Sequence, residues 1–160
     1  MRKQKGFSLI ELLIVVAIIL IIAAIAIPNL LRSRIAANEA SAVGSIRTIN
    51  TAEVTYSSTY PNVGFSCSMG DFQPPAAGAN PTSTAAGLID GVLAAGQKSG
   101  YNFALVGCTG TPIVTYQSTG VPVSIGQTGQ RGFCSDQSGV IKFSADGTAA
   151  SCLAGTTTLQ

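Results

Sequence analysis

A nearly unbroken apolar run near the start of the chain limits what this protein can fold into. It extends from Phe7 to Ile27, 21 residues in which Glu11 is the one charged side chain. At about 1.5 Å per residue, a helix of this length spans roughly 31 Å, the thickness of a bilayer's hydrocarbon core. The run therefore predicts a transmembrane helix. Its carboxylate needs an explanation, because charges inside such helices are costly and usually functional.

Basic residues flank the apolar run on both sides, so they do not decide its orientation. They are Arg2, Lys3 and Lys5 before it, and Arg32 and Arg34 after it. The four cysteines all lie beyond the run, in a region rich in Gly, Ser and Thr: Cys67, Cys108, Cys134 and Cys152. An even number of cysteines in such a region predicts disulfides in an oxidising compartment. We therefore expect the amino end in the cytoplasm and the rest of the chain outside.

A secretory signal peptide is a competing interpretation of the basic start and the apolar run. The run is longer than a normal signal core, and "IPNLLRSRIAANEA" follows it without a clear small-x-small cleavage site. The glycine before Phe7 favours a different cut, between Gly6 and Phe7, which would remove the basic residues and keep the helix. Such a cut would leave six basic and seven acidic residues, since three of the nine basic ones precede it. The product would be nearly neutral, without the basic patch that nucleic-acid binding requires.

The stretch "KGFSLIELLIVVAIILIIAAIAIPNLLRSR" resembles the amino-terminal signature of type IV pilins and their pseudopilin relatives. It has a short basic leader, a glycine before the cleavage point, phenylalanine at the new terminus, glutamate fifth in the mature chain and proline after the apolar run. The resemblance implies cleavage between Gly6 and Phe7 by a prepilin peptidase, N-methylation of Phe7 and polymerisation into a helical filament. It also implies a precursor in the inner membrane, a pilus assembly platform with its ATPase, and a filament at the cell surface.

Glu11 fits this resemblance in physical terms. It lies four residues after Phe7, about 6 Å along a helix, so that in a membrane it stays near the cytoplasmic interface. Inside a filament an unpaired carboxylate would be costly, whereas cleavage creates a cation, the α-amino group of Phe7. We predict that Glu11 pairs with the amino group of Phe7 on a neighbouring subunit. The alternative is an interface glutamate that tolerates its position.

Beyond Pro28 the apolar residues recur at helical spacing, which predicts an amphipathic half of the same helix, ending near Tyr56. The stripe consists of Leu31, Ile35, Ala42, Ile46, Ile49, Val54 and Tyr56. The residues between them are polar: Arg32, Arg34, Asn38, Glu39, Arg47 and Glu53. Pro28 removes a backbone donor and should kink the helix or let it melt locally. Leu20 stands where many relatives have a glycine, so extensive melting is less supported.

The rest of the chain predicts a loop followed by a sheet. In the connector, Leu88, Ile89, Val92 and Leu93 predict one face of a short helix that ends at Gly96. From Tyr101 onward, five short segments are typical of strands: "YNFALVG", "PIVTYQS", "VPVSIG", "RGFCSD" and "GVIKFSA". Asp136 and Gly139 predict the turn of a hairpin over residues 131–145.

The expected fold is α+β and pilin-like: a long amino-terminal helix, its first half transmembrane, packed on a carboxyl-terminal antiparallel sheet. The predicted parts are a leader over 1–6, a transmembrane and filament-core helix over 7–28, its amphipathic half over 29–60, a connector over 61–100, and the sheet and tail over 101–160.

The cysteines allow three pairings, and the sequence does not choose among them. A bridge between Cys134 and Cys152 could staple the tail to the hairpin, and Cys67 and Cys108 would then join the connector to the sheet. Reduced cysteines are the alternative. A zinc site is disfavoured, because the sequence has no C-x-x-C pair and no histidine.

The sequence favours a structural protein over an enzyme. Without histidine, its acidic residues show no catalytic spacing, and no phosphate-binding glycine loop occurs, so no cofactor is predicted. Calcium at Asp136 and Asp146 is an alternative that turn chemistry also explains. The expected function is a structural subunit of a type IV pilus. The other two candidates are a pseudopilin of a type II secretion system and a membrane-anchored binding module that does not polymerise.

Overall fold

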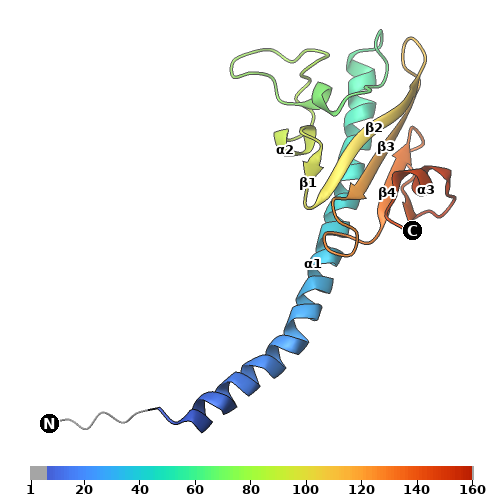
Figure 1. Ribbon diagram of the computed structural model, residues 1–160. Helices are drawn as coiled ribbons and strands as arrows, with labels where there is room; N and C mark the ends of the chain where they lie inside the picture. The colour runs from blue at the N-terminus through green and yellow to red at the C-terminus, as the bar shows by residue number, and fades with distance from the viewer. Residues whose placement is uncertain (1–6, 160) are drawn as a thin grey trace. The chain divides into compact units, whose positions relative to one another are not determined.

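One long helix, α1, is followed by a small sheet with short helices. The computed structural model describes residues 7–159, so the predicted leader lies outside the described residues. The elements in chain order are α1 (Leu9–Thr59), η1 (Met69–Phe72), α2 (Gly91–Ala94), β1 (Gln97–Lys98), β2 (Tyr101–Thr109), β3 (Thr115–Pro122), β4 (Gly132–Asp136), β5 (Lys142–Ser144) and α3 (Ala149–Ala154) (Figure 1). The chain divides into two units, one ending at Arg34 and the other beginning at Ile35.

The described part of the first unit, residues 7–34, is almost entirely an exposed apolar helix. α1 is long and apolar enough to cross a membrane, and none of its most apolar stretch is buried within the chain. Its large side chains, from Leu9 to Leu30, have no core of their own to enter. α1 continues through Pro28 without interruption. The helix is therefore not melted at Pro28 in the isolated chain. A kink there, and melting in an assembled filament, stay predictions.

The second unit, residues 35–159, is called the head below. Its sheet has five antiparallel strands in the order β1-β2-β3-β4-β5, so that each strand pairs with its neighbour in the sequence. The head's part of α1 lies along one face of this sheet (Figure 1). The core forms between them, with Ile46 and Ile49 from the helix and Tyr101, Phe103 and Phe133 from the sheet. This arrangement confirms the predicted α+β fold.

The buried stripe of α1 repeats at alternating spacings of three and four residues, as one face of a helix requires. Its buried members at this spacing are Glu39, Ala42, Ile46, Ile49, Glu53 and Tyr56. The predicted stripe was wrong at two positions, because Val54 is 60% exposed and Leu31 is 40% exposed. Glu39 and Glu53, placed by the sequence among the polar residues, lie in the buried face instead.

The sheet differs from the sequence prediction at β3, as well as in its unpredicted edge strand β1. The two segments "PIVTYQS" and "VPVSIG" contribute to one continuous strand, β3, because the residues between them stay in the ladder. Gly120, which looks like a turn residue, pairs with Phe103 on one side and Phe133 on the other. A Cβ at this position would lie 2.9 Å from the Phe103 ring, so glycine is needed for the close packing. The predicted hairpin is confirmed by β4 and β5, whose turn places the amide of Gly139 on the carbonyl of Asp136.

The connector contains less helix than predicted. Its helix α2 has four residues and begins after Asp90, whose side chain accepts hydrogen bonds from the backbone of Val92 and Leu93 and so caps it. Val92 is exposed, which corrects the predicted apolar face, whereas Leu93 is buried. The predicted end at Gly96 agrees with its left-handed backbone, φ +82°. The sequence did not predict β1, η1 or α3.

Candidate functional sites: the assembly segment and the carboxylates of the head

The amino-terminal segment holds the predicted processing and assembly residues. Gly6 lies outside the described residues, and Phe7, the first described residue, is 78% exposed. The backbone amide of Ser8 donates a 2.9 Å hydrogen bond to Oε2 of Glu11. This is half of an S-x-x-E capping box, in which a glutamate in the first turn accepts the amide before the helix. Sequence reasoning missed it, although the letters "SLIE" were sufficient to find it.

This capping contact changes how Glu11 is understood. In the isolated chain the carboxylate already has a local partner at the start of α1, where the positive end of the helix dipole also favours an acid. This contact uses only Oε2, so the carboxylate keeps acceptor capacity for the amino group of Phe7 on another subunit, and that pairing stays a prediction.

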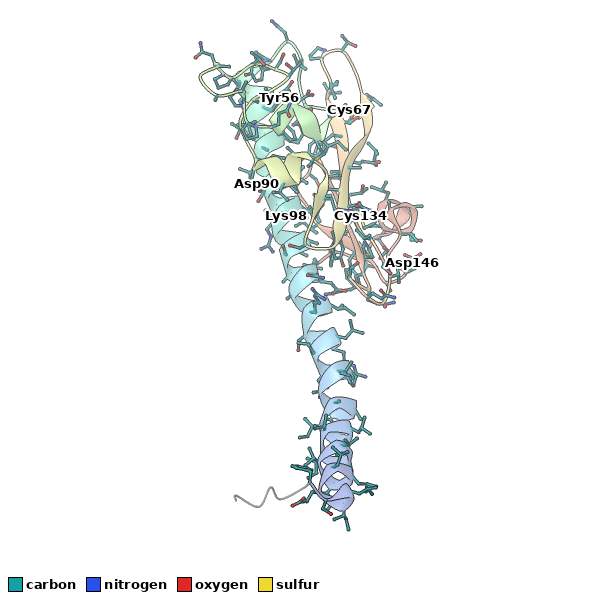
Figure 2. The ribbon with its side chains drawn as sticks, turned by 60° about the vertical axis from the view of Figure 1, so that its left-hand side comes forward. Tyr56, Cys67, Asp90, Lys98, Cys134 and Asp146 are labelled. Atoms are coloured by element: carbon teal, nitrogen blue, oxygen red, sulfur yellow. A yellow bond between two sulfur atoms is a disulfide. The ribbon has the colours of Figure 1, made fainter. Side chains whose placement is uncertain are left out.

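Two disulfides hold the head together, which confirms the predicted oxidation of the cysteines. Cys67 in the connector is bonded to Cys108 on β2, and Cys134 on β4 is bonded to Cys152 on α3. Of the three pairings that the sequence allowed, the structure therefore has the one that ties the tail to the hairpin. Figure 2 shows Cys67 and Cys134 in different parts of the head. The connector and the tail, which contain little regular structure, are thus each attached covalently to the sheet.

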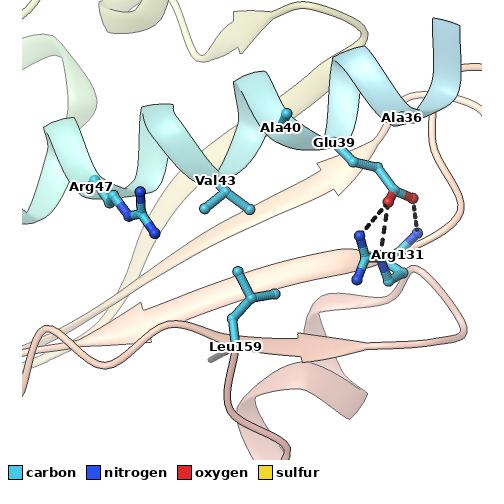
Figure 3. Close-up of a pocket in the computed structure, with 7 residues that line it drawn as sticks. All are labelled: Ala36, Glu39, Ala40, Val43, Arg47, Arg131 and Leu159. Atoms are coloured by element: carbon cyan, nitrogen blue, oxygen red, sulfur yellow. Dashed lines mark hydrogen bonds and ion pairs between the residues drawn. The ribbon is translucent and has the colours of Figure 1, made fainter. Parts of the chain in front are cut away.

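Glu39 is buried and fully paired. Its Oε1 accepts the backbone amides of Gln130 and Arg131, each at 3.0 Å, and its Oε2 accepts Nε and Nη2 of Arg131 at 2.8 Å (Figure 3). Burial alone raises the pKa of Glu39, but the hydrogen bonds from Arg131 and Gln130 and the Arg131 charge outweigh it. The net pKa lies below the ordinary value, so Glu39 stays ionised. The pair joins α1 to the start of β4.

Glu53 lies on the same face of α1, 14 residues later, in a different environment. Its side chain is fully buried, and its Oε2 accepts the backbone amide of Ser66 at 2.8 Å. No group in the described part of the chain donates to its Oε1. The pKa of Glu53 is raised to about 7, mainly because burial disfavours the charged form. The hydrogen bond from the Ser66 amide lowers the pKa, and the negative charge of Asp71 raises it. Sequence reasoning missed this site, because the contact with Ser66 comes from the irregular connector.

The two carboxylates considered for calcium serve local turns. Asp136 accepts the amide and hydroxyl of Ser138 and lies 3.5 Å from Nζ of Lys142. Asp146, labelled in Figure 2, accepts from Thr148 and Ser151 at the start of α3, and these hydrogen bonds lower its pKa to about 2. Within residues 7–159 no group of three or more His, Cys, Asp or Glu side chains is placed to hold a metal ion. Turn chemistry therefore accounts for both residues.

Comparison with known proteins gives one family match and two similar proteins. Residues 1–27 match the family described as "Prokaryotic N-terminal methylation motif". Over 39 residues, the chain is 67% identical to "Type IV wide pilus major component PilA4" of Thermus thermophilus. This match covers 24% of this chain and 30% of that protein. Over 54 residues it is 43% identical to "Type IV major pilin protein PilA" of Myxococcus xanthus, covering 34% of this chain and 24% of that protein.

The matches are confined to part of each protein. The chain spans less than a third of the length of these curated relatives. No solved structure matches the chain. The relatives therefore match at most about a third of this chain, and the family motif matches residues 1–27.

Proposed function

We propose that this chain, which carries the amino-terminal segment of the type IV pilins, is a structural subunit of a type IV pilus. The observation that carries the proposal is the first half of α1: a methylation motif followed by an apolar helix that buries none of its side chains within the chain. Such a helix needs either lipid or other apolar helices around it. A head that folds on its own contacts leaves the helix available for both.

The proposed sequence of events uses the residues that the motif contains. A prepilin peptidase cleaves between Gly6 and Phe7, and the new amino group of Phe7 is methylated. The precursor is anchored in the inner membrane with its head outside, and an assembly platform with its ATPase moves it into an extracellular filament. In this role the chain performs no catalysis, and its main partner is a second copy of itself.

Glu11 supplies the register of the filament in this proposal. Exchanging lipid for neighbouring apolar helices gains little hydrophobic energy, because lipid tails are as apolar as the helix side chains. Apolar contacts also distinguish poorly between positions shifted along the helix axis. An ion pair between Glu11 and the amino group of Phe7 on a neighbour forms at one shift and is lost at others. Glu11 must exchange its contact with the Ser8 amide, or share it, when the pair forms.

Two other functions fit parts of the chain. A pseudopilin of a type II secretion system has the same amino-terminal signature, and a membrane-anchored binding module would use the helix as a plain anchor. The Ser, Thr and Gly content of the head favours a surface-exposed pilus subunit over a pseudopilin. Electron microscopy of filaments sheared from the cell surface separates the pilus subunit from the plain anchor.

The test of the proposal is substitution of Glu11. Glu11→Leu makes the membrane-resident helix more apolar, so a plain anchor would be retained at least as well. A filament subunit would leave the neighbour's amino group buried without its partner, a change that costs about 3–5 kcal/mol. We therefore expect processed Glu11→Leu subunits to accumulate in the membrane while the filament yield falls to a small fraction.

Glu11→Gln is the matched control, because it keeps the shape and the acceptor for the Ser8 amide but removes the charge. A low filament yield in both variants, with normal leader removal by intact-mass measurement, supports the ion pair. Normal filament yield from processed Glu11→Leu subunits would contradict it and leave the capping contact as the role of Glu11.

A further inference from the structure

The head contains one buried acid without a counterion, Glu53. Its side chain is fully buried, Oε2 accepts the amide of Ser66, and Oε1 receives no hydrogen bond from residues 7–159. Glu53 also forms no ion pair with any of these residues. A buried carboxylate in this situation is costly, whereas the neutral acid is tolerated.

The groups that face Glu53 do not compensate a negative charge. Asp71 on η1 is an acid, and its Oδ2 accepts the hydroxyl of Ser66, the same residue whose amide donates to Glu53. Tyr56 on α1 and Tyr116 on β3 are phenols whose pKa values are raised, mainly by burial and partly by Glu53. Their hydroxyls donate elsewhere, to the carbonyl of Ser83 and to Oδ1 of Asn50.

The cations of the head are placed away from Glu53. The three that form ion pairs do so with other acids: Lys98 with Asp90, Arg131 with Glu39, and Lys142 with Asp136. Arg47 lines a groove with Val43 and Leu159 (Figure 3). From β2, Cys108 brings no titrating group, because it is in a disulfide.

We propose that Glu53 is a proton-binding site of the head, and that loss of its proton loosens the attachment of residues 60–72 to α1. The neutral acid accepts the amide of Ser66 and holds this segment on the helix. The ionised form places a negative charge next to Asp71 with no cation, which is relieved when the segment moves and admits water. The bond between Cys67 and Cys108 then limits the opening, because it keeps the segment attached to β2.

The direction of the pH dependence follows from the folded-state pKa. Because the closed form raises the pKa of Glu53 from 4.5 to about 7, it binds the proton more tightly than the open form does. The stabilisation is complete below about pH 4.5 and is lost as the pH rises toward about 7. The segment is therefore closed in mildly acid conditions and looser in mildly alkaline ones. All the groups involved lie in the head, so the inference does not rest on filament assembly.

The experiment follows the segment and the proton separately in the full chain in detergent. Hydrogen exchange of residues 60–72 is measured between pH 5 and pH 8.5, and each rate is corrected for the intrinsic pH dependence of exchange. We expect protection in the wild type to fall by a factor on the order of ten to a hundred across this range. Glu53→Gln, which imitates the neutral acid, should change by less than a factor of about two or three.

Glu39→Gln is the matched control. It removes the charge of another buried glutamate on the same face of α1, but Glu39, unlike Glu53, is paired with a cation, Arg131. It should keep the wild-type pH dependence in residues 60–72. The carboxyl carbon of Glu53, followed by NMR in the wild type alone, should titrate near pH 7, and this measurement does not require any variant to fold. Titration in the ordinary range of a glutamate, or equal protection at pH 5 and pH 8.5, would overturn the proposal.

Discussion

The carboxylates in the two halves of α1 differ in burial and in the partners that they contact. In the half before Arg34, Glu11 stands alone in an apolar helix and has one contact, the amide of Ser8 within its own first turn. In the half that belongs to the head, Glu39 and Glu53 lie in the buried face and receive contacts from other segments, Glu39 from Arg131 and Glu53 from Ser66 in the connector. The same helix therefore contains an acid whose one contact is local and acids whose contacts come from the fold of the head. The difference shows that the apolar half of α1 gains no tertiary contact within the chain, whereas the head half is held by its own.

The largest effect is expected from a change that blocks leader removal, because it should affect the amino-terminal half of α1 and leave the head unchanged. Gly6→Val should prevent leader removal, so that Phe7 never gains its free amino group and filaments are absent. The head should be unaffected, because its core and both disulfides lie beyond residue 35. Intact mass and non-reducing peptide mapping measure the two properties together. Removal of the first six residues from the Gly6→Val protein would show that processing does not require Gly6.

The disulfides give a smaller effect that is confined to the head. Closing a loop by a bridge stabilises the fold more for longer loops. The sequence separations of 41 for Cys67–Cys108 and 18 for Cys134–Cys152 correspond to about 4 and about 3 kcal/mol, respectively. Replacing each pair by serines should lower the free energy of unfolding of the head by these amounts, measured by denaturant titration.

Both serine variants should still be processed and inserted in the membrane, because the apolar half of α1 makes no disulfide. This serves as the internal control. A variant that loses membrane insertion as well as head stability would show that the two halves depend on each other.

The smallest effect concerns the paired acid of the head. The contacts of Glu39 hold its pKa below the ordinary value, so their stabilisation is present above about pH 4.5 and is lost as the pH falls further. Glu39→Gln should lower the free energy of unfolding by about 1–2 kcal/mol at pH 7, since hydrogen bonds to a charged group are lost while Arg131 keeps access to water. Denaturant titration at pH 7 and pH 3 measures it, and the difference from wild type should shrink at pH 3.

An equal difference at both pH values would mean that packing of the side chain, and not its charge, stabilises the contact with β4. A difference that shrinks at pH 3, together with the opposite pH dependence expected for Glu53, would sharpen the contrast between a paired and an unpaired acid on one helix face.

The amino-terminal half was predictable because its signal is local. Length, hydropathy and the order of Gly6, Phe7, Glu11 and Pro28 lie in one continuous stretch, and a helix shows the same pattern in any surroundings. The hairpin of β4 and β5 was predictable for the same reason, since Asp136 and Gly139 form its turn from adjacent residues.

The buried acids were not predictable, because their partners come from elsewhere in the chain. A glutamate at a helical position is usually solvated, and the contact that buries Glu39 comes from Arg131, 92 residues later. The contact that buries Glu53 comes from Ser66 in a connector without regular structure. Gly120 looks like a turn residue for a related reason. Glycine is required there because the Phe103 ring on the neighbouring strand leaves no room for a side chain, which the local sequence does not show.

The order of the strands has a consequence for how the head is built during synthesis. Each strand from β2 to β5 pairs with the strand made just before it, so the sheet can grow by one edge as the chain is completed. Folding of this kind closes short loops in succession, and short-range contacts form faster than long-range ones. The contact between Arg131 and Glu39 must wait until most of the sheet exists, because it joins the last strands to the first helix. Until then, Glu39 on the buried face of α1 lacks its partner, although the earlier strands β2 and β3 already supply core residues against the same helix.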